Sequence, residues 1–256
     1  MIDREKKYIL VLSGGGSKGF YALGILKALE ESGLKGNIEA IFGVSAGAML
    51  AAYRGAGRKT DEIFERFMQN NAFNLSNLKL PPIEGFINDK PVRKMFEEDL
   101  PKQMSDLNLP VYIGATDLVK GEYHLFHEGD LVPILMGSIS LPVVFTPVKY
   151  KDYTLVDGGV LNNFPVALAK QQYPDKEVIG ITMSKFNQDQ KISSMISTAF
   201  VSFNLVFSKS VEENKGLVEH LFYKDTGLAT TDNNKERIAK VYKEGYQEGL
   251  SYFSET

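Results

Sequence analysis

Two apolar segments near the N-terminus each run directly into a glycine-containing turn and then into a segment with helical spacing. Residues 8–12 (YILVL) precede a glycine-rich stretch at 13–19, and residues 38–42 (IEAIF) precede GVSAG at 43–47. Short continuous apolar runs are typical of strands buried on both faces, and strands that alternate with helices form parallel sheets. The pattern predicts an α/β fold in which helices cover both faces of a mainly parallel sheet.

Apolar periodicity, caps and turn residues predict the remaining elements. Helices are expected at 22–29 with a stop at Gly33, at 46–53, from residue 60, at 92–100, 165–173 and 192–207, and near the C-terminus. Strands are expected at 111–115, 148–150, 153–156, 178–183 and 218–223, and a loop at 75–88. No repeat or long linker divides the chain. We therefore predict a single domain over 1–256, with a motif-bearing core at 8–184 and a C-terminal helical extension, 185–256, packed on it.

The composition narrows the classes of partner. Hydrophobic residues make up 43% and charged residues 24%, as in soluble globular proteins. The chain has 29 Lys and Arg against 32 Asp and Glu, a net charge of −3, which provides no overall attraction to nucleic acid. It has no cysteine, and three histidines leave little for a metal site. We expect no nucleic-acid partner, no metal and no cofactor.

Targeting signals are not predicted. Residues 1–7 mix basic and acidic side chains, and no small-residue cleavage site follows the first apolar segment. The longest uncharged run, 131–148, contains three prolines and is shorter than the ~20 apolar residues of a spanning helix. We expect a cytoplasmic protein that meets membranes, if at all, as a peripheral one.

The sequence Gly43-Val44-Ser45-Ala46-Gly47 fits the G-x-S-x-G nucleophile elbow. An apolar strand runs directly into Gly43 and a helix begins directly after Ser45, which is the context that this motif requires. Gly43 and Gly47 are needed because side chains at these positions would collide with the neighbouring strand and helix. The competing interpretation is a tight strand-to-helix turn in which Ser45 only caps the helix. The context favours Ser45 as a nucleophile.

The glycine-rich stretch at 14–19 is suited to stabilising an oxyanion. Consecutive glycines let the amide groups of Gly14, Gly15 and Gly16 point to one side, and Lys18 adds positive charge. The same stretch also spells G-x-G-x-x-G, a dinucleotide-binding pattern. That hypothesis needs an acidic residue at the end of the second strand, whereas Glu39 lies near its start. A phosphate-binding P-loop is disfavoured because Gly19, not Ser or Thr, follows Lys18.

From the residues alone, two groups remain candidates for the base that activates Ser45. Chain order allows a Ser45, Asp157, His220 triad. However, His220 lies in an alternating, strand-like run, as do His124 and His127, and such histidines are more often structural. Asp157-Gly158-Gly159 follows an apolar strand, and the two glycines allow its carboxyl to approach a partner closely. Burial in an apolar site would raise the pKa of Asp157 from about 3.9 toward that of a useful base.

These motifs, in this order and spacing, resemble the patatin-like phospholipase family. The resemblance includes the stretches at 115–118, 129–131, 138–145 and 162–165, and covers about residues 8–184. It implies a three-layer α/β/α sandwich and metal-independent hydrolysis of lipid acyl esters. By resemblance, Ser45 is the nucleophile and Asp157 the general base of a dyad, and Gly14 to Gly16 with Lys18 form the oxyanion hole. Gly19, Gly43, Gly47, Gly158 and Gly159 support these motifs.

Two alternatives use the same machinery: thioesterase or acyltransferase chemistry, and a catalytically weak lipid-binding or regulatory module. The expected partner is a lipid or acyl ester, which a membrane surface can present. Apolar side chains that can serve an acyl chain lie in two groups: Phe64, Phe67, Phe73, Phe86 and Ile87, and then Met195, Ile196, Phe200, Phe203 and Phe207. Such stripes are more often core, while the later one also suits a lid, a dimer face or a membrane-dipping surface.

Overall fold

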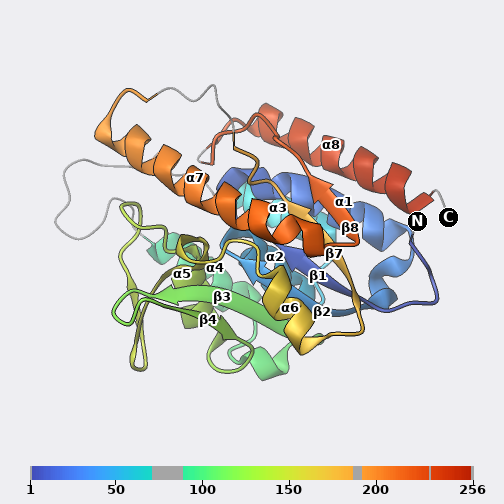
Figure 1. Ribbon diagram of the computed structural model, residues 1–256, viewed down its shortest axis with the longest axis horizontal. Coiled ribbons are helices and arrows are strands. Elements are labelled where there is room, and N and C mark those ends of the chain that lie inside the picture. The colour runs from blue at the N-terminus through green and yellow to red at the C-terminus, as the bar shows by residue number, and fades with distance from the viewer. Residues whose placement is uncertain (1, 71–88, 187–191, 231, 255–256) are drawn as a thin grey trace.

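The computed structural model describes residues 2–70, 89–186, 192–230 and 232–254 (Figure 1). In this part of the chain one sheet of eight strands has the order β5-β6-β3-β2-β1-β7-β8, and β4 pairs with β3 as well. The strands are β1 (Tyr8–Leu12), β2 (Ile38–Val44), β3 (Val111–Asp117), β4 (Glu122–Phe126), β5 (Val148–Tyr150), β6 (Tyr153–Asp157), β7 (Glu177–Thr182) and β8 (His220–Tyr223). Pairs among β1, β2, β3, β7 and β8 are parallel, and the pairs that involve β4 or β6 are antiparallel.

Helices cover both faces of this sheet. One face packs on α1 (Gly19–Glu31), α2 (Ala46–Gly55), α3 (Thr60–Asn70), α4 (Lys90–Asp99), α5 (Leu131–Ile139) and α8 (Lys235–Ser254). The other packs on α6 (Val166–Gln172) and the C-terminal part of α7 (Met195–Asn214), which lie on the near side in Figure 1. Strand β1 contributes to both cores, since Tyr8, Leu10 and Leu12 face one layer and Ile9 and Val11 face the other. The predicted sheet with helices on both faces is confirmed.

Most predicted elements agree with the structure, but α5 was not predicted. Its residues are uncharged and almost all buried, so no polar stripe reveals a helical period. Pro133 lies in the first turn, where a missing amide hydrogen costs no helical hydrogen bond. Strands β2 and β3 each extend two residues beyond the predicted ends. The predicted loop at 75–88 lies outside the described residues.

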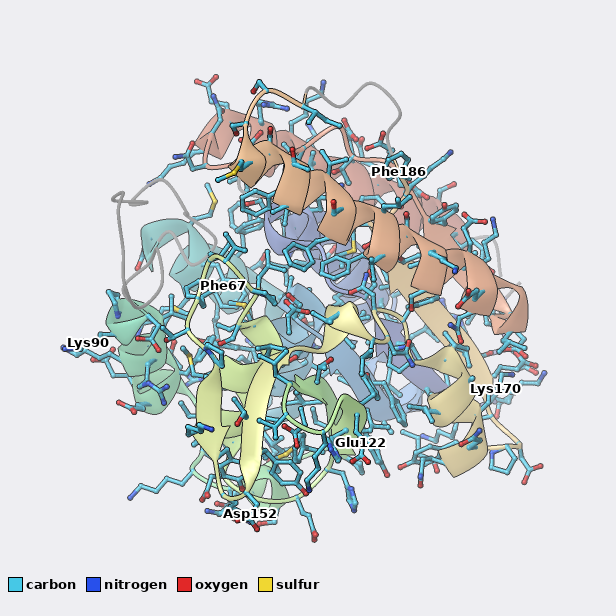
Figure 2. The ribbon with its side chains drawn as sticks, turned by 60° about the vertical axis from the view of Figure 1, so that its left-hand side comes forward. Phe67, Lys90, Glu122, Asp152, Lys170 and Phe186 are labelled. Atoms are coloured by element: carbon cyan, nitrogen blue, oxygen red, sulfur yellow. The ribbon has the colours of Figure 1, made fainter. Side chains whose placement is uncertain are left out.

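The C-terminal segment is joined to the core through both a strand and a helix. Strand β8 pairs in parallel with β7 and so extends the central sheet. Figure 2 shows the layers from a second side, with Asp152 at the β5–β6 turn far from α7. Helix α8 lies beside α1. The two helices pack backbone to backbone, because a Cβ on Gly24 would lie 2.1 Å from the Tyr242 carbonyl oxygen and one on Gly245 would lie 2.1 Å from that of Tyr21.

The register of β3 brings the ends of two other strands together. Strand β4 pairs with residues 113–117, which fills one edge of β3. On the other edge β2 ends with Val44 opposite Gly114, and β6, running in the opposite direction, ends with Asp157 opposite Ala115. The two strands thus meet end to end at consecutive positions of β3. This meeting point places Asp157 beside the residue that follows Val44, which is Ser45.

Candidate active site

Ser45 occupies a sharp turn between β2 and α2. Its backbone has φ 54° and ψ −122°, a conformation that is strained for a residue with a side chain. The flanking glycines are required by close packing, as predicted: a Cβ on Gly43 would lie 2.5 Å from the Gly47 carbonyl oxygen, and one on Gly47 would lie 2.3 Å from that of Leu12. The turn therefore has the geometry of a nucleophile elbow.

A serine of α5 fixes this turn. The Ser45 amide donates to Ser138 Oγ at 3.0 Å, and Ser138 Oγ donates to the Gly114 carbonyl oxygen at 2.7 Å. Ser138 is fully buried and thus links the elbow to β3. Ser138 lies in a stretch of family resemblance, but the sequence predicts no contact for it, because nothing local to residue 138 indicates that α5 reaches the end of β2.

Asp157 ends β6 and begins the Gly158–Val160 3₁₀ turn. Its Oδ1 accepts the Gly159 amide hydrogen at 2.8 Å, and its own amide donates to the Ser140 carbonyl oxygen at 2.9 Å. Neither glycine of this turn has room for a side chain, because a Cβ on Gly158 would lie 2.4 Å from the Gly114 carbonyl oxygen and one on Gly159 would lie 2.6 Å from the Phe207 ring. The turn therefore packs directly against β3 and α7.

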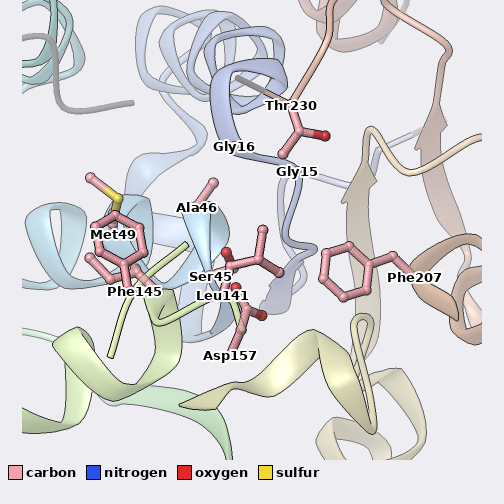
Figure 3. Close-up of a pocket in the computed structure, with 11 residues that line it drawn as sticks. Gly15, Gly16, Ser45, Ala46, Met49, Leu141, Phe145, Asp157, Phe207 and Thr230 are labelled. Carbon is pink, nitrogen blue, oxygen red and sulfur yellow. The ribbon is translucent and has the colours of Figure 1, made fainter. Parts of the chain in front are cut away.

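The carboxyl of Asp157 is buried and titrates in an unusual range. Burial raises its pKa from 3.8 to about 7, and hydrogen bonding from the Ser45 hydroxyl and the Gly159 amide lowers the pKa less than burial raises it. Figure 3 shows the Ser45 hydroxyl and the Asp157 carboxyl directed toward one another at the centre of the site. The structure thus brings together the two side chains that the sequence analysis paired.

The glycine loop after β1 lies beside this pair, and its three glycines differ in their contacts. The Gly14 amide donates to Asn163 Oδ1 at 3.0 Å, so its hydrogen is already engaged. Gly15 and Gly16 line the pocket that contains Ser45, and no hydrogen bond of either amide is found within the described residues. These two amides are therefore the donors available to an oxyanion, and Gly14 is not.

Thr230, from the segment between β8 and α8, closes over the glycine loop. A Cβ on Gly16, which has φ 56°, would lie 2.2 Å from the Thr230 carbonyl oxygen. The same carbonyl accepts the Ser17 amide hydrogen at 2.9 Å. Figure 3 shows Thr230 against Gly16, so the C-terminal segment forms part of the site wall although its sequence contains no motif that we could name.

Lys18 lies at the start of α1, which begins at Gly19. It is almost fully buried, and burial lowers the pKa of its ammonium group while the charge of Asp225 raises it. Among the described residues that line the pocket of Ser45, Lys18 is not found. The predicted contribution of Lys18 to an oxyanion hole stays a prediction, and the structure supports it less than it supports the Gly15 and Gly16 amides.

The pocket around Ser45 is mainly apolar. It encloses about 530 Å³, including space open to solvent. Besides the glycine loop, Thr230 and the Ser45–Asp157 pair, its wall is formed by Ala46, Met49, Ile139, Leu141, Phe145 and Phe207. Phe207 projects from α7 on one side of Ser45, and Met49 and Phe145 lie on the other side (Figure 3). An apolar cleft with one reactive polar pair suits a substrate with a hydrocarbon chain next to a polar bond.

The two predicted apolar stripes have different locations. In the first, Phe67 is core and Phe64 stacks on Tyr242 of α8, so neither lines the pocket. In the second, Phe207 lines the pocket while Phe200 and Phe203 pack beside it with Leu141 and Val144, and Met195 is 89% exposed. Phe73, Phe86, Ile87 and the side chain of Ile196 lie outside the described part of the chain.

His220 lies at the opposite end of the sheet from Ser45. It pairs with Ile179, which pairs with Leu10, which in turn pairs with Ile41 of β2. Ser45 lies four residues beyond Ile41, just after the end of this strand. Strand spacing and rise separate the two residues by about 14 Å across the sheet and about 13 Å along it. His220 instead hydrogen-bonds Tyr252 and Glu177 at 2.9 and 3.0 Å. The histidine triad is therefore excluded by geometry, in agreement with the structural interpretation of this residue.

The other two histidines are also outside the pocket. His124 on β4 makes an edge contact with Tyr153, and His127 stacks on Tyr112. Neither lines the pocket, and His124 is half-buried whereas His127 is exposed. Over the described ranges, no group of three or more His, Asp or Glu side chains is arranged to hold a metal ion.

Comparisons with known proteins identify a matching family and related sequences. The model of the family described as "Patatin-like phospholipase" matches residues 10–170. The chain is 28% identical over 193 residues to the mouse "Patatin-like phospholipase domain-containing protein 6", with 71% of this chain and 14% of that protein covered. It is also 28% identical over 230 residues to the uncharacterized protein YqhO of Bacillus subtilis, with 77% and 78% covered. The chain thus spans only a small part of the mouse relative.

A solved structure supports the same fold. VipD from Legionella pneumophila superposes with a TM-score of 0.60 at 17% identity, covering 98% of this chain and 67% of that one. Fold and site together define an α/β protein with an elbow serine and a buried carboxyl at the end of its sheet. The chain belongs to the patatin-like phospholipase family. The printed description of the family names a phospholipase.

Among the described helices, none is both long enough and apolar enough to cross a membrane.

Proposed function

We propose that this protein cleaves fatty-acyl esters of lipids, with Ser45 as the nucleophile and Asp157 as the general base. The observation that carries the proposal is the pairing of a buried carboxyl with the hydroxyl of an elbow serine, inside an apolar pocket. A structural aspartate at this depth would be expected to have a full set of donors. Asp157 has one backbone amide and the Ser45 hydroxyl.

In the first half of the reaction, Ser45 Oγ attacks the ester carbonyl carbon while the Asp157 carboxylate takes the hydroxyl proton. Negative charge develops on the carbonyl oxygen, and the amides of Gly15 and Gly16 donate hydrogen bonds to it. When the tetrahedral intermediate collapses, Asp157 returns the proton to the oxygen of the leaving alcohol. The products are a free alcohol and an acyl ester on Ser45.

In the second half, a water molecule attacks the acyl carbonyl carbon and gives a proton to Asp157. The same amides stabilise the second oxyanion. Collapse breaks the bond to Ser45 Oγ, which regains its proton from Asp157, and a carboxylic acid leaves. A carboxyl with pKa about 7 is a stronger base than an ordinary aspartate and is still partly ionised at neutral pH.

The pocket wall supports an acyl chain as the part of the substrate that is bound. Five of its side chains are apolar and large: Met49, Ile139, Leu141, Phe145 and Phe207. Burying a methylene group against such a wall contributes about 0.8 kcal/mol. Affinity should therefore increase with chain length until the pocket is filled.

Covalent labelling tests the proposal. A fluorophosphonate probe should modify the wild-type protein, peptide mapping should locate the adduct at Ser45, and Ser45→Ala should remove both the adduct and the hydrolysis of a p-nitrophenyl acyl ester. Ser32→Ala, at the end of α1, is a matched control that should keep both. Folded wild-type protein that neither reacts nor hydrolyses any ester would favour a lipid-binding module instead. Labelling together with preference for acyl thioesters or acyl transfer would assign a thioesterase or acyltransferase.

A further inference from the structure

Asn163 and Ser184 hydrogen-bond both polar backbone groups of Gly14, its N–H and its carbonyl oxygen. Asn163 Oδ1 accepts the Gly14 amide hydrogen at 3.0 Å, and Asn163 Nδ2 donates to Ser184 Oγ at 2.9 Å. Ser184 Oγ in turn donates to the Gly14 carbonyl oxygen at 2.9 Å, and Ser13 Oγ donates to the same oxygen at 3.0 Å. Asn163 is fully buried and Ser184 nearly so. The side chains and the backbone of Gly14 thus form a closed ring of hydrogen bonds.

This ring determines where the next amide points. The Gly14 carbonyl and the Gly15 N–H belong to one planar trans peptide group, so they are directed to opposite sides. The carbonyl is held toward Ser13 and Ser184, which follow β1 and β7 and do not line the pocket. The Gly15 N–H therefore points to the other side, and Gly15 lines the pocket beside Ser45.

Asn163 also contacts the other half of the site. A Cβ on Gly14 would lie 2.6 Å from Asn163 Oδ1 and 2.9 Å from Ser45 Cβ, so Gly14 is held between these two side chains. A Cβ on Gly159 would lie 2.9 Å from the same Oδ1, and the Gly159 amide is the donor to Asp157. Asn163 itself is anchored to α7, because its backbone N–H donates to Ser210 Oγ at 2.9 Å.

We propose that Asn163 and Ser184 are positioning residues that hold the Gly14–Gly15 peptide with its N–H directed at the developing oxyanion. This inference rests on the proposed hydrolase function and assigns the two residues no contact with substrate. Their hydrogen bonds should matter more in the transition state than in the bound substrate, because the oxyanion exists only in the former.

The test separates positioning from general structural support. Ser184→Ala removes one donor to the Gly14 carbonyl, and Asn163→Asp keeps an acceptor for the Gly14 amide but cannot donate to Ser184. With a short-chain p-nitrophenyl ester, kcat should fall about 10-fold for Ser184→Ala and about 100-fold for Asn163→Asp, while KM changes less than about two-fold. Ser184→Thr, which keeps the hydroxyl, should restore most of the rate. Ser208→Ala is the matched control and should behave as wild type, because Ser208 is a buried serine whose hydroxyl donates to the Leu205 carbonyl oxygen of its own helix, α7.

Inhibitor affinity provides the second measurement. An acyl trifluoromethyl ketone, which forms an oxyanion on the serine, should lose affinity in parallel with kcat. A long-chain alcohol, which forms none, should bind the variants as it binds wild type. Folded Ser184→Ala with wild-type kcat would overturn the inference, as would an equal loss of affinity for both ligands. If Ser45→Ala also retains full hydrolysis, the proposed function itself fails. If only Ser45→Ala loses activity, the positioning inference alone fails.

Discussion

Two carboxyl groups at opposite ends of the central sheet differ in what surrounds them. Glu177 begins β7, is partly exposed, and hydrogen-bonds Lys6 and His220, which together hold its pKa below its usual range. Asp157 ends β6 in an apolar pocket, where burial raises its pKa to about 7. The first carboxyl is stabilised as an anion by its partners, whereas the second is destabilised as an anion by its location.

The comparison shows how a structural acid can be distinguished from a reactive one. The Glu177 carboxyl hydrogen-bonds both Lys6 and His220, and the other ring nitrogen of His220 hydrogen-bonds the Tyr252 hydroxyl. The Asp157 carboxyl faces a hydroxyl and a cleft that can admit another molecule. Perturbed pKa values in clefts are typical of functional sites, and paired, satisfied groups are typical of structural ones.

The largest expected difference between substitutions of the two carboxyls is in hydrolytic activity. Asp157→Asn preserves the shape of the carboxyl and an acceptor for the Gly159 amide but removes the base, so ester hydrolysis should fall at least about 1000-fold. Glu177→Gln and His220→Gln, at the other end of the sheet, should each stay within about two-fold of wild type when rates are corrected for folded protein. Steady-state kinetics with circular dichroism of each variant measures this. A large loss with His220→Gln would revive the histidine triad.

The pH profile should report Asp157 and not Glu177. Because the base must be ionised, kcat/KM should rise about tenfold per pH unit below about pH 7 and level off above it. Glu177→Gln should leave this midpoint unchanged. Buffered rate measurements from pH 5 to 9 test the assignment, and a midpoint near pH 4 would show that the carboxyl is not desolvated in solution.

Stability should depend on pH with opposite signs at the two carboxyls. The folded pKa of Asp157 lies above the unfolded value of 3.8, so the folded state binds the extra proton between these values and the free energy of unfolding falls as pH rises through this window. Asp157→Asn removes that cost and should exceed wild type in stability by up to about 4 kcal/mol above pH 7, but by nothing near pH 3. Urea unfolding at several pH values provides the comparison. Equal free energies of unfolding for Asp157→Asn and wild type at pH 8 would contradict this expectation.

The smallest expected effect is that of Glu177→Gln on stability. The lowered pKa of the Glu177 carboxyl contributes stability that is present above the unfolded pKa of 4.5 and is lost as pH falls through the folded pKa. Because the group is partly solvated, the loss at pH 7 should be below about 1 kcal/mol and should shrink in acid. The same unfolding series measures it, and a loss that grows as pH falls would show that the sign is wrong.

Local sequence accounts for the elements and for much of the site. The signals for the strands at 8–12, 148–150 and 153–156 and for the glycines that flank Ser45 lie within a few residues, because strand burial and close packing are short-range requirements. Helix α5 is the exception, since burial on all sides leaves no amphipathic pattern to detect.

Only the tertiary structure decided which residues meet. Ser45 and Asp157 lie 112 positions apart in the chain, and they come together because β2 and β6 end at consecutive residues of one edge of β3. Ser138, Asn163 and Thr230 reach the site from α5, from the turn after β6 and from the C-terminal segment. Such contacts follow from strand register and helix packing over the whole chain. The residue types of the candidate site were thus determined by the sequence, whereas the fold alone determined their distances, their burial and the raised pKa of the Asp157 carboxyl.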